Sequence, residues 1–499
     1  MFALSAQVDD GVRKSMEPWI KDDVTFYEHQ ITGIRQMMQM RNVLLADDMG
    51  LGKSLQAQVV AAGDIVRGWG DRILVVAPLT LKGNWAAEFE KFTGIPYLIL
   101  GQEPNPKHPG RMKAVTPLKR IEQLKEFDAI YGPKALIVNY EQVIPHLAEL
   151  NRMKFHVIIW DEAHYLKNHK AKRTQASHKL KSDRKLLLTG TPMLNQVDEL
   201  WSLLHMIDPA GYPNYWNFRN RYCVFGGFQD KQIIGVKNEK ELQERLKSVM
   251  IRRLKKDVLD LPDIQYIVRK LDLSPEQQRL YDKAEAQLEI DIVGMDSPSE
   301  IENALTKFLR LKQICGTTLP FNGKDDSAKL DVAVEDAVQI LSNGNRLVVF
   351  TQFREVLEAF ATRLDKALPD VPIWELHGDI KQPDRQPYVD EWSNHPKAGV
   401  IVCMLQVAGI GLNMTAARHQ QFIDKLFVPG LNQQAVDRSH RIGASKTQPI
   451  QVLEYHMKGT VETRVEQILR TKSKLFGTIV NDFDFKKKLI QQLRDKNAA

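Results

Sequence analysis

Residues 44–54 constrain the fold more strongly than any other part of this sequence. They overlap an apolar run at 43–46 and then bring two glycines, a lysine and a serine close together. Gly50 and Gly52 allow the backbone to curl so that successive N–H groups face a phosphate. This order is typical of a β-strand, a phosphate-binding loop and the first turn of a helix. It therefore predicts an α/β fold with a nucleotide site.

Two side chains of this segment have the chemistry that a triphosphate needs. Lys53 places a point charge against the outer phosphates, and Ser54 offers a hydroxyl to Mg²⁺. One position departs from the full phosphate-loop consensus, because Asp47 stands where the first glycine is expected. Taken alone, the segment could also be an ordinary surface loop.

A second segment, residues 157–164, completes the prediction. Three apolar residues and Trp160 lead directly into Asp161 and Glu162, which is unlike a solvated acidic turn and typical of a buried strand that ends at a ligand. Asp161 can hold Mg²⁺, usually through water, and Glu162 can orient and deprotonate the attacking water. Together the two segments predict hydrolysis of a nucleoside triphosphate.

The rest of the chain alternates apolar runs with amphipathic segments in both halves, which predicts parallel sheets with helices on both faces. The second half repeats the architecture of the first without a phosphate loop. Candidate strands lie at 42–46, 72–77, 135–139, 157–160 and 185–189, and then at 346–351, 371–376, 398–404, 420–423 and 448–455. The intervening segment 200–259 is expected to be largely helical, and 461–497 is expected to be helical as well.

Composition adds few constraints. The chain has 499 residues, a net charge of +7 and a pI near 9.0, which suits either a polyanionic partner or plain solubility. Its three cysteines are far apart and form no CxxC pair, so we expect neither a zinc site nor disulfides, and reduced thiols in the cytoplasm. No apolar stretch has the length of a membrane span or of a signal peptide.

The second half offers cations of its own. Arg438 and Arg441 are three residues apart, so on a helix they share one face. Two guanidiniums directed at a γ-phosphate would stabilise the charge of the transition state. The alternative is a solvated basic helix end.

Taken together, these motifs resemble those of the Swi/Snf-type (sucrose-non-fermenting) DNA-dependent ATPases of helicase superfamily two. The matching segments follow the family's order from about residue 26 to about residue 475. They include YEHQ at 27–30, DDMGLGKS at 47–54, DEAH at 161–164 with LKN at 166–168, LTGTP at 188–192, RRLKKDV at 252–258 with LP at 261–262, GIGLN at 409–413 and QAVDRSHRIG at 434–443. The departures, Asp48 for Glu, Trp160 for a smaller residue and the sequence after Cys315, remove no catalytic group.

The resemblance implies an α/β fold of two tandem RecA-like lobes. We expect an N-terminal arm at 1–25 and a first, ATP-binding lobe at 26–265 with a helical protrusion at about 200–260. The second lobe is expected at 266–455 with a helical insertion at about 274–320, followed by a helical C-terminal brace at 456–499.

The resemblance also implies ATP and Mg²⁺ as cofactors and assigns residues to them. Gln30 would bond the adenine edge, while Arg438 and Arg441 would complete the site when the lobes close. Asp161 and Glu162 keep the roles given above, and His164 would bridge toward the LTGTP segment. The expected cofactor-binding residues are Gln30, Asp48, Met49, Gly50, Leu51, Gly52, Lys53, Ser54 and Gly411, with Ser54 and Asp161 holding Mg²⁺.

Double-stranded DNA is the implied partner, contacted through its phosphates without sequence specificity. The residues expected to contact DNA or to link it to the nucleotide site are Asn139, Thr189, Gly190, Thr191, Gln352 and Asn413. We expect a monomer in which hydrolysis drives movement along duplex DNA, with a protein partner for targeting. The alternatives are a strand-separating helicase and a DNA-bound clamp with little turnover.

An aromatic cluster in the protrusion, interleaved with Arg219 and Arg221, allows two interpretations. It could stack on bases or form the core of the protrusion, and we favour the core because aromatic residues are more often buried. The cluster consists of Tyr212, Tyr215, Trp216, Phe218, Tyr222 and Phe225.

Overall fold

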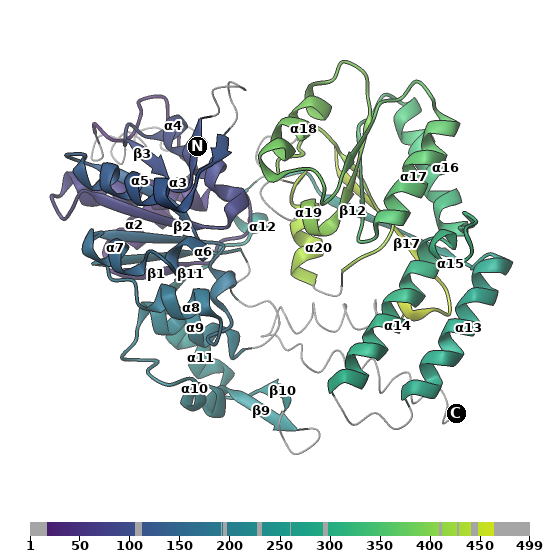
Figure 1. Ribbon diagram of the computed structural model, residues 1–499, viewed down its shortest axis with the longest axis horizontal. Coiled ribbons are helices and arrows are strands. Elements are labelled where there is room, and N and C mark those ends of the chain that lie inside the picture. The colour runs from purple at the N-terminus through teal and green to yellow at the C-terminus, as the bar shows by residue number, and fades with distance from the viewer. Residues whose placement is uncertain are drawn as a thin grey trace. The chain divides into compact units, whose positions relative to one another are not determined.

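The computed structural model describes residues 17–104, 112–190, 192, 197–226, 232–259, 261–292, 298–408, 412–426, 429–440 and 448–463. The chain divides into two compact units, Met1–Val224 with Val236–Leu259, and Phe225–Gly235 with Asp260–Ala499. Each unit contains one large parallel sheet with helices packed against it (Figure 1). The predicted α/β class is therefore confirmed.

The sheet of the first unit has seven strands in the order β11-β1-β8-β7-β2-β6-β3. Its five long strands lie where the apolar runs predicted them, with ends that differ by one residue at most. The strands are β1 (Asn42–Leu45), β2 (Arg72–Ala77), β3 (Tyr97–Ile99), β6 (Lys134–Asn139), β7 (Val157–Asp161), β8 (Arg184–Leu188) and β11 (Met250–Ile251).

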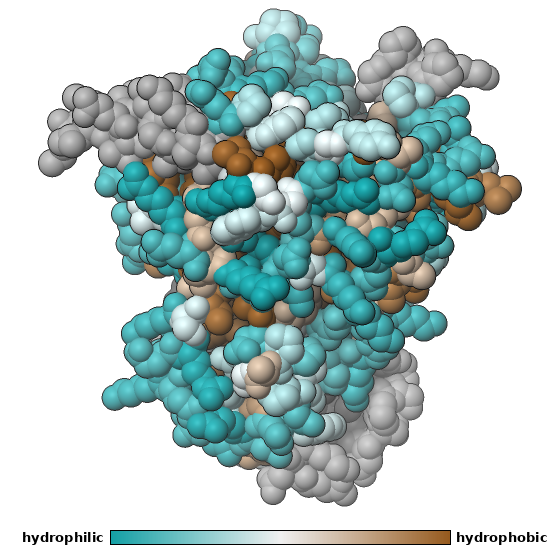
Figure 2. Space-filling view, turned by 90° about the vertical axis from the view of Figure 1, so that its left-hand side faces the viewer, coloured by the Kyte–Doolittle hydropathy of each residue, from teal (hydrophilic) through white to brown (hydrophobic). Residues whose placement is uncertain are grey.

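Both faces of this sheet are buried, because alternate residues of each strand point to opposite sides and almost all are inaccessible. One face packs against α5 (Pro117–Ala129), α6 (Tyr140–Val143), α7 (Leu147–Arg152), α8 (Lys172–His178) and α9 (Glu199–Ile207). The other is covered by α2 (Glu28–Gln39), α3 (Lys53–Val66) and α4 (Lys82–Phe92). The outer surface in Figure 2 is accordingly mainly hydrophilic, with small apolar areas between polar side chains.

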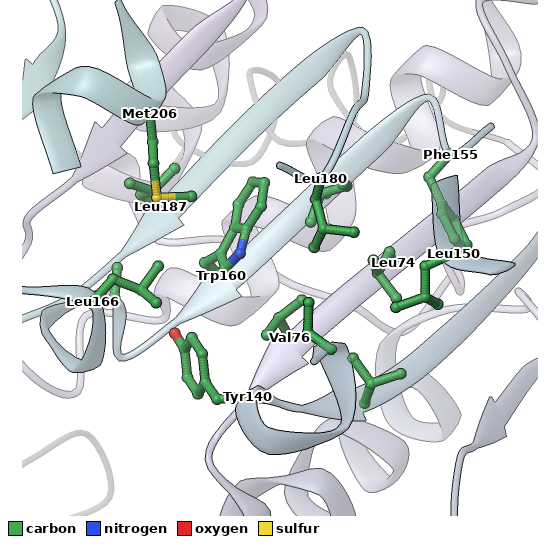
Figure 3. Close-up of a cluster of buried hydrophobic side chains, with 14 of the residues drawn as sticks. Leu74, Val76, Tyr140, Leu150, Phe155, Trp160, Leu166, Leu180, Leu187 and Met206 are labelled. Atoms are coloured by element: carbon green, nitrogen blue, oxygen red, sulfur yellow. The ribbon is translucent and has the colours of Figure 1, made fainter. Parts of the chain in front are cut away.

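Trp160, the unusually large residue before the two carboxylates, is fully buried on β7. Its indole lies among Leu166, Leu187 and Met206, in the hydrophobic core between the sheet and helices α5 to α9 (Figure 3). Burial of a large apolar side chain contributes about 1.5–3 kcal/mol. The indole therefore packs beneath the end of the strand that carries Asp161.

The segment after α9 is only partly helical, so the expectation for 200–259 is wrong in part. Its helices are α10 (Tyr215–Tyr222), α11 (Glu239–Lys247) and α12 (Lys255–Val258), but a two-stranded sheet of β9 (Cys223–Gly226) and β10 (Gln232–Val236) interrupts them. Afterwards β11 joins β1 in parallel. A two-residue strand carries no periodic signal, which explains why the sequence did not reveal it.

The sheet of the second unit has six parallel strands in the order β12-β17-β16-β13-β15-β14. Five of them were predicted, whereas β12 was not. The strands are β12 (Ile264–Leu271), β13 (Leu347–Thr351), β14 (Ile373–Leu376), β15 (Val400–Met404), β16 (His419–Phe422) and β17 (Ile450–Met457).

The expected boundary between the lobes, at 265/266, needs correction. It falls inside β12, which pairs with β17 along its whole length, and the units divide at Leu259/Asp260. Because β12 is an edge strand with exposed residues at several consecutive positions, it lacks the apolar run that marked the other strands.

Helices cover both faces of the second sheet as well. Residues of α16 (Ala328–Ser342) and α17 (Arg354–Ala367) pack on one face, and those of α18 (Gln382–Asn394), α19 (Leu405–Ala408) and α20 (Pro429–Val436) on the other. The predicted insertion consists of α13 (Pro275–Ile292), α14 (Pro298–Gly316) and α15 (Leu319–Asn322). The Ser274 hydroxyl accepts a hydrogen bond from Gln277 N at 3.1 Å, as expected of a helix cap.

The two ends of the chain are described only in part. Within the expected arm, Ile20 forms a bridge with Thr93, and Ile20 and Val24 are buried. The expected helix at 461–497 lies outside the described residues beyond position 463. Among the helices that the structure describes, none combines the length and apolarity of a membrane span.

Candidate nucleotide site

The phosphate loop connects the end of β1 to the start of α3 and depends on two glycines. Gly50 has φ +81° and Gly52, the N-cap of α3, has φ +73°, a left-handed conformation that glycine adopts without strain. A Cβ on Gly52 would also lie 2.3 Å from Gln30 Nε2. The loop therefore leads directly into the first turn of α3, whose free backbone N–H groups can bind an anion.

Gln30, the residue expected to bond adenine, is buried beside this loop on α2. Its Nε2 donates to Leu51 O at 3.3 Å, and its Oε1 accepts from Tyr27 N at 3.0 Å. His29 Nε2 also lies 3.2 Å from Leu51 O. The start of α2 and the phosphate loop are thus joined directly.

Lys53 is folded back onto its own loop. Its Nζ donates to Asp47 O at 2.9 Å and to Asp48 O at 3.1 Å. Gly190 lies close by, because a Cβ there would be 2.7 Å from Met49 Cγ and 3.7 Å from Lys53 Nζ. The residues that follow β8 therefore contact the phosphate loop.

Asp161 and Glu162 lie at the carboxyl end of β7, as predicted. Asp161 Oδ2 accepts from Trp85 Nε1 at 2.8 Å, its Oδ1 accepts from Glu162 N at 2.9 Å, and its backbone oxygen accepts from Tyr140 OH at 2.6 Å. Burial, and then the charge of Glu162, raise the pKa of Asp161 above its usual range. A buried carboxylate whose charge is disfavoured in this way is suited to a divalent cation.

His164 joins this acidic pair to the segment after β8. Its Nδ1 lies 3.2 Å from Glu162 Oε2 and 3.2 Å from Thr189 Oγ1. Thr189 is buried, and its N donates to Leu45 O at 3.1 Å. The predicted bridge from the DEAH segment to the LTGTP segment is therefore confirmed.

Asp47, the departure from the loop consensus, has a structural role that the sequence did not reveal. Its fully buried carboxylate accepts from Arg253 Nε at 3.0 Å and from Arg253 N at 3.0 Å. The same guanidinium donates to Gln56 Oε1 at 2.9 Å and to His29 O. Arg253 therefore ties the loop to α2 and α3. The RRLKKDV motif was the available signal, although its partner could not be inferred from it.

The other loop positions follow the same arrangement. Asp48 Oδ2 accepts from Lys255 N at 3.0 Å, so the RRLKKDV segment holds both aspartates. Leu51 is buried, and Ser54 is half-buried in the first turn of α3. A hydroxyl at Ser54 and the carboxylate of Asp161 provide the oxygen donors that Mg²⁺ prefers.

The residues expected to contact DNA have varied environments. Asn139 is buried and its Oδ1 accepts from Gln142 N at 2.9 Å, so it caps α6. In the second unit, Gln352 is buried with Nε2 3.5 Å from Lys425 O, whereas Asn413 is exposed. Arg438 is buried. Thr191, Gly411 and Arg441 lie outside the described residues.

His440 connects two further motifs within the second unit. Its Nε2 lies 3.0 Å from Pro262 O, so the LP pair after the RRLKKDV motif contacts the segment that carries Arg438. Met414 N also donates to Arg438 O at 3.1 Å. The GIGLN and QAVDRSHRIG segments are therefore neighbours through their described residues.

Comparison with known proteins places these motifs in a family. A model described as SNF2-related domain matches residues 29–318, and one described as helicase conserved C-terminal domain matches residues 332–443. An ATP-dependent helicase of Mycoplasma genitalium is 29% identical over 455 residues, which cover 89% of this chain and 41% of the relative. The ATP-dependent DNA helicase DDM1 of Arabidopsis thaliana is 26% identical, covering 92% of this chain and 62% of that protein.

Among solved structures, the Sulfolobus solfataricus SWI2/SNF2 ATPase core in complex with dsDNA matches with 25% identity and a TM-score of 0.41, covering 94% of this chain and 95% of that chain. The chain spans about two fifths of the length of the Mycoplasma relative. The SNF2-related match extends over more than half of the chain and includes the phosphate loop, the DEAH segment and the RRLKKDV segment. The chain therefore belongs to the SNF2-related family.

Proposed function

We propose that this chain is an ATP hydrolase whose activity depends on DNA and drives movement along the duplex. The observation that carries the proposal is the position of His164, whose Nδ1 lies at 3.2 Å from both Glu162 Oε2 and Thr189 Oγ1. His164 thereby connects the carboxylate of Glu162 to Thr189, in the segment that is expected to link the nucleotide site to DNA. Any shift of Thr189 changes the environment of Glu162.

The residues of the first unit divide the chemistry among them. Lys53 exchanges the two loop carbonyls for phosphate oxygens, and Gln30 turns its amide from Leu51 O to the adenine edge. Ser54 and Asp161 would hold Mg²⁺, which would neutralise charge on the phosphates. Glu162 accepts the proton of the attacking water.

Two cations of the second unit belong to the same proposal. Arg438 and Arg441 stabilise the negative charge that develops on the transferred phosphoryl group. The Arg441→Ala variant should retain ATP binding and lose turnover.

The DNA part of the proposal rests on the family and on the chain's net charge of +7. The relative from Arabidopsis is named an ATP-dependent DNA helicase. Contacts to phosphates depend on salt and carry little sequence information. Because Asn139 caps α6, we propose that it positions this helix and leaves the phosphate contacts to its neighbours. The remaining roles proposed are coupling for Thr189, Gly190 and Thr191, and DNA contact for Gln352 and Asn413.

The test is the steady-state ATPase rate without nucleic acid and with single-stranded DNA, duplex DNA or RNA. We expect strong stimulation by the duplex, and loss of turnover in Lys53→Ala and Glu162→Gln with DNA binding retained. Stimulation mainly by single strands, together with strand displacement, would favour a strand-separating helicase. Wild-type turnover in Glu162→Gln would refute the assigned chemistry.

A further inference from the structure

The aromatic cluster around α10 separates into a buried part and an exposed part. Tyr212, Phe218 and Tyr222 are buried, so the core interpretation is confirmed for these three. Trp216 differs, because its side chain is 55% exposed although it belongs to the same helix. A single exposed aromatic ring is ordinary by itself, so what marks Trp216 is the set of groups around its ring.

Trp216 lies at the outer end of a row of three aromatic rings. Its ring lies 5.2 Å from that of Tyr215, which in turn lies 4.0 Å from the ring of His169. Tyr215 OH donates to Asp198 Oδ2 at 2.6 Å, and Asn214 Oδ1 accepts from Trp216 N at 2.8 Å as the cap of α10. Each contact that restricts the ring before binding lowers the conformational entropy that a stacking ligand would cost.

The surroundings of this ring are cationic and amide-rich. The Arg219 guanidinium lies 5.5 Å from the Trp216 ring centroid, one turn further along α10. The helix has the sequence YWNFRNRY, with two arginines, two asparagines and no carboxylate. The exposed Lys170 follows His169 directly. Arg221 is less available, because its Nε pairs with Glu241 Oε1 at 2.8 Å.

We propose that Trp216 stacks on an unpaired base of DNA, while Arg219 and Lys170 contact the adjoining phosphates. An aromatic face with flanking cations is the chemistry that binds single-stranded nucleic acid without sequence preference. The inference rests on the proposed function and extends it by naming the substrate class, which is DNA with a single-stranded segment such as a tailed or forked duplex. An apolar protein surface is a poorer match for this helix, because its exposed neighbours are amides and cations.

The test compares two equally exposed tryptophans in the full chain. Trp69 is 56% exposed and also has an arginine near its ring, with Arg67 at 5.2 Å, but it lies outside the α10 cluster. The dissociation constant for a fluorescent oligothymidylate should rise about 5- to 100-fold in Trp216→Ala, because one base stack is lost. It should change less than about 2-fold in Trp69→Ala, and Trp216→Phe should restore most of the affinity.

A salt titration separates stacking from charge. The variant Lys170→Ala should lower the slope of log K against log salt by about 0.7, the value for one phosphate of a single strand, whereas Trp216→Ala should leave the slope unchanged. A fully paired duplex should bind Trp216→Ala as tightly as it binds the wild type. Unchanged oligothymidylate affinity in Trp216→Ala, or an equal loss in Trp69→Ala, would overturn the inference.

The proposed function and the present inference would fail in different measurements. Failure of the proposed function would appear as wild-type ATP hydrolysis that no DNA stimulates. Failure of the present inference would appear in the binding curves alone. Because the described contacts of Trp216 are with Asn214, Tyr215 and Arg219, Trp216→Ala should keep the wild-type ATPase rate without DNA.

Discussion

Removal of the Arg253 guanidinium should destabilise the first unit and weaken nucleotide binding together. In the Arg253→Ala variant the fully buried Asp47 carboxylate loses its ion-pair partner, and Gln56 and His29 O each lose a donor. Breaking a buried ion pair from one side costs about 3–5 kcal/mol, because the remaining charge stays buried without compensation. For a unit of this size that corresponds to a fall in melting temperature of roughly 6–20 °C.

The adjacent Arg252 provides the matched control. Its guanidinium lies 3.8 Å from Asp48 Oδ1, and both side chains are about one third exposed, so Arg252→Ala should cost at most about 1 kcal/mol. The Michaelis constant for ATP should rise in Arg253→Ala more than in Arg252→Ala, because the loop is no longer fixed to α2 and α3. The assays are differential scanning calorimetry and steady-state ATPase kinetics. Equal melting temperatures for the two variants would refute the argument.

Three further predictions follow from other described contacts. Gly52→Ala should lose ATP binding, because its Cβ would meet Gln30 Nε2 at 2.3 Å. The control Gly68→Ala has a similar φ of +71° and no atom within 4 Å of its Cβ, so it should lose about 1 kcal/mol of stability and keep the ATPase activity. Equal ATPase activities of the two variants would contradict this prediction. The pKa of Asp161 is raised, so its neutral form, which holds Mg²⁺ poorly, persists to a higher pH than for an ordinary aspartate. A pH profile of kcat/KM for ATP should accordingly lose activity on the acid side at a pH above the usual range near 4, and a profile flat down to pH 4 would count against it. Burial lowers the pKa of Lys82 to about 7, so between about pH 7 and 10 the unfolded chain binds the extra proton and the free energy of unfolding rises with pH. Lys82→Met should abolish that rise in denaturation curves at pH 7 and pH 9, and an equal rise in the variant would show that another group is responsible.

Much of the fold was predictable because its strands are short apolar runs buried on both faces. The apolar runs of β2 and β7 are easily recognised in the sequence, and motifs such as the DEAH segment begin where these strands end. The strand β12 was missed because it lies at a sheet edge and alternates too little. The two-stranded sheet of β9 and β10 was missed because its strands have only four and five residues and lie between segments that indicated helix.

The sequence offered candidate site residues, but it did not reveal their contacts. The residue types at Lys53, Asp161 and Glu162 reveal their chemistry, because a phosphate loop and a strand-terminal acidic pair have few other uses. The pairing of Arg253 with Asp47 joins positions about two hundred residues apart, and only the folded chain brings them together. Asn139, expected to contact DNA, also caps α6, a contact that its residue type alone did not reveal.

The contacts also identify which groups must move when a nucleotide binds. Lys53 Nζ donates to two carbonyls of its own loop, and Gln30 Nε2 donates to Leu51 O, so both groups have partners before ATP arrives. The backbone that presents them is fixed by the buried pair of Asp47 and Arg253, which joins the loop to two helices. A rigid loop with two exchangeable side chains loses little order on binding, because only side-chain torsions change. Under the proposed function, recognition would therefore fall to the side chains of Lys53 and Gln30, while Arg253 positions the loop.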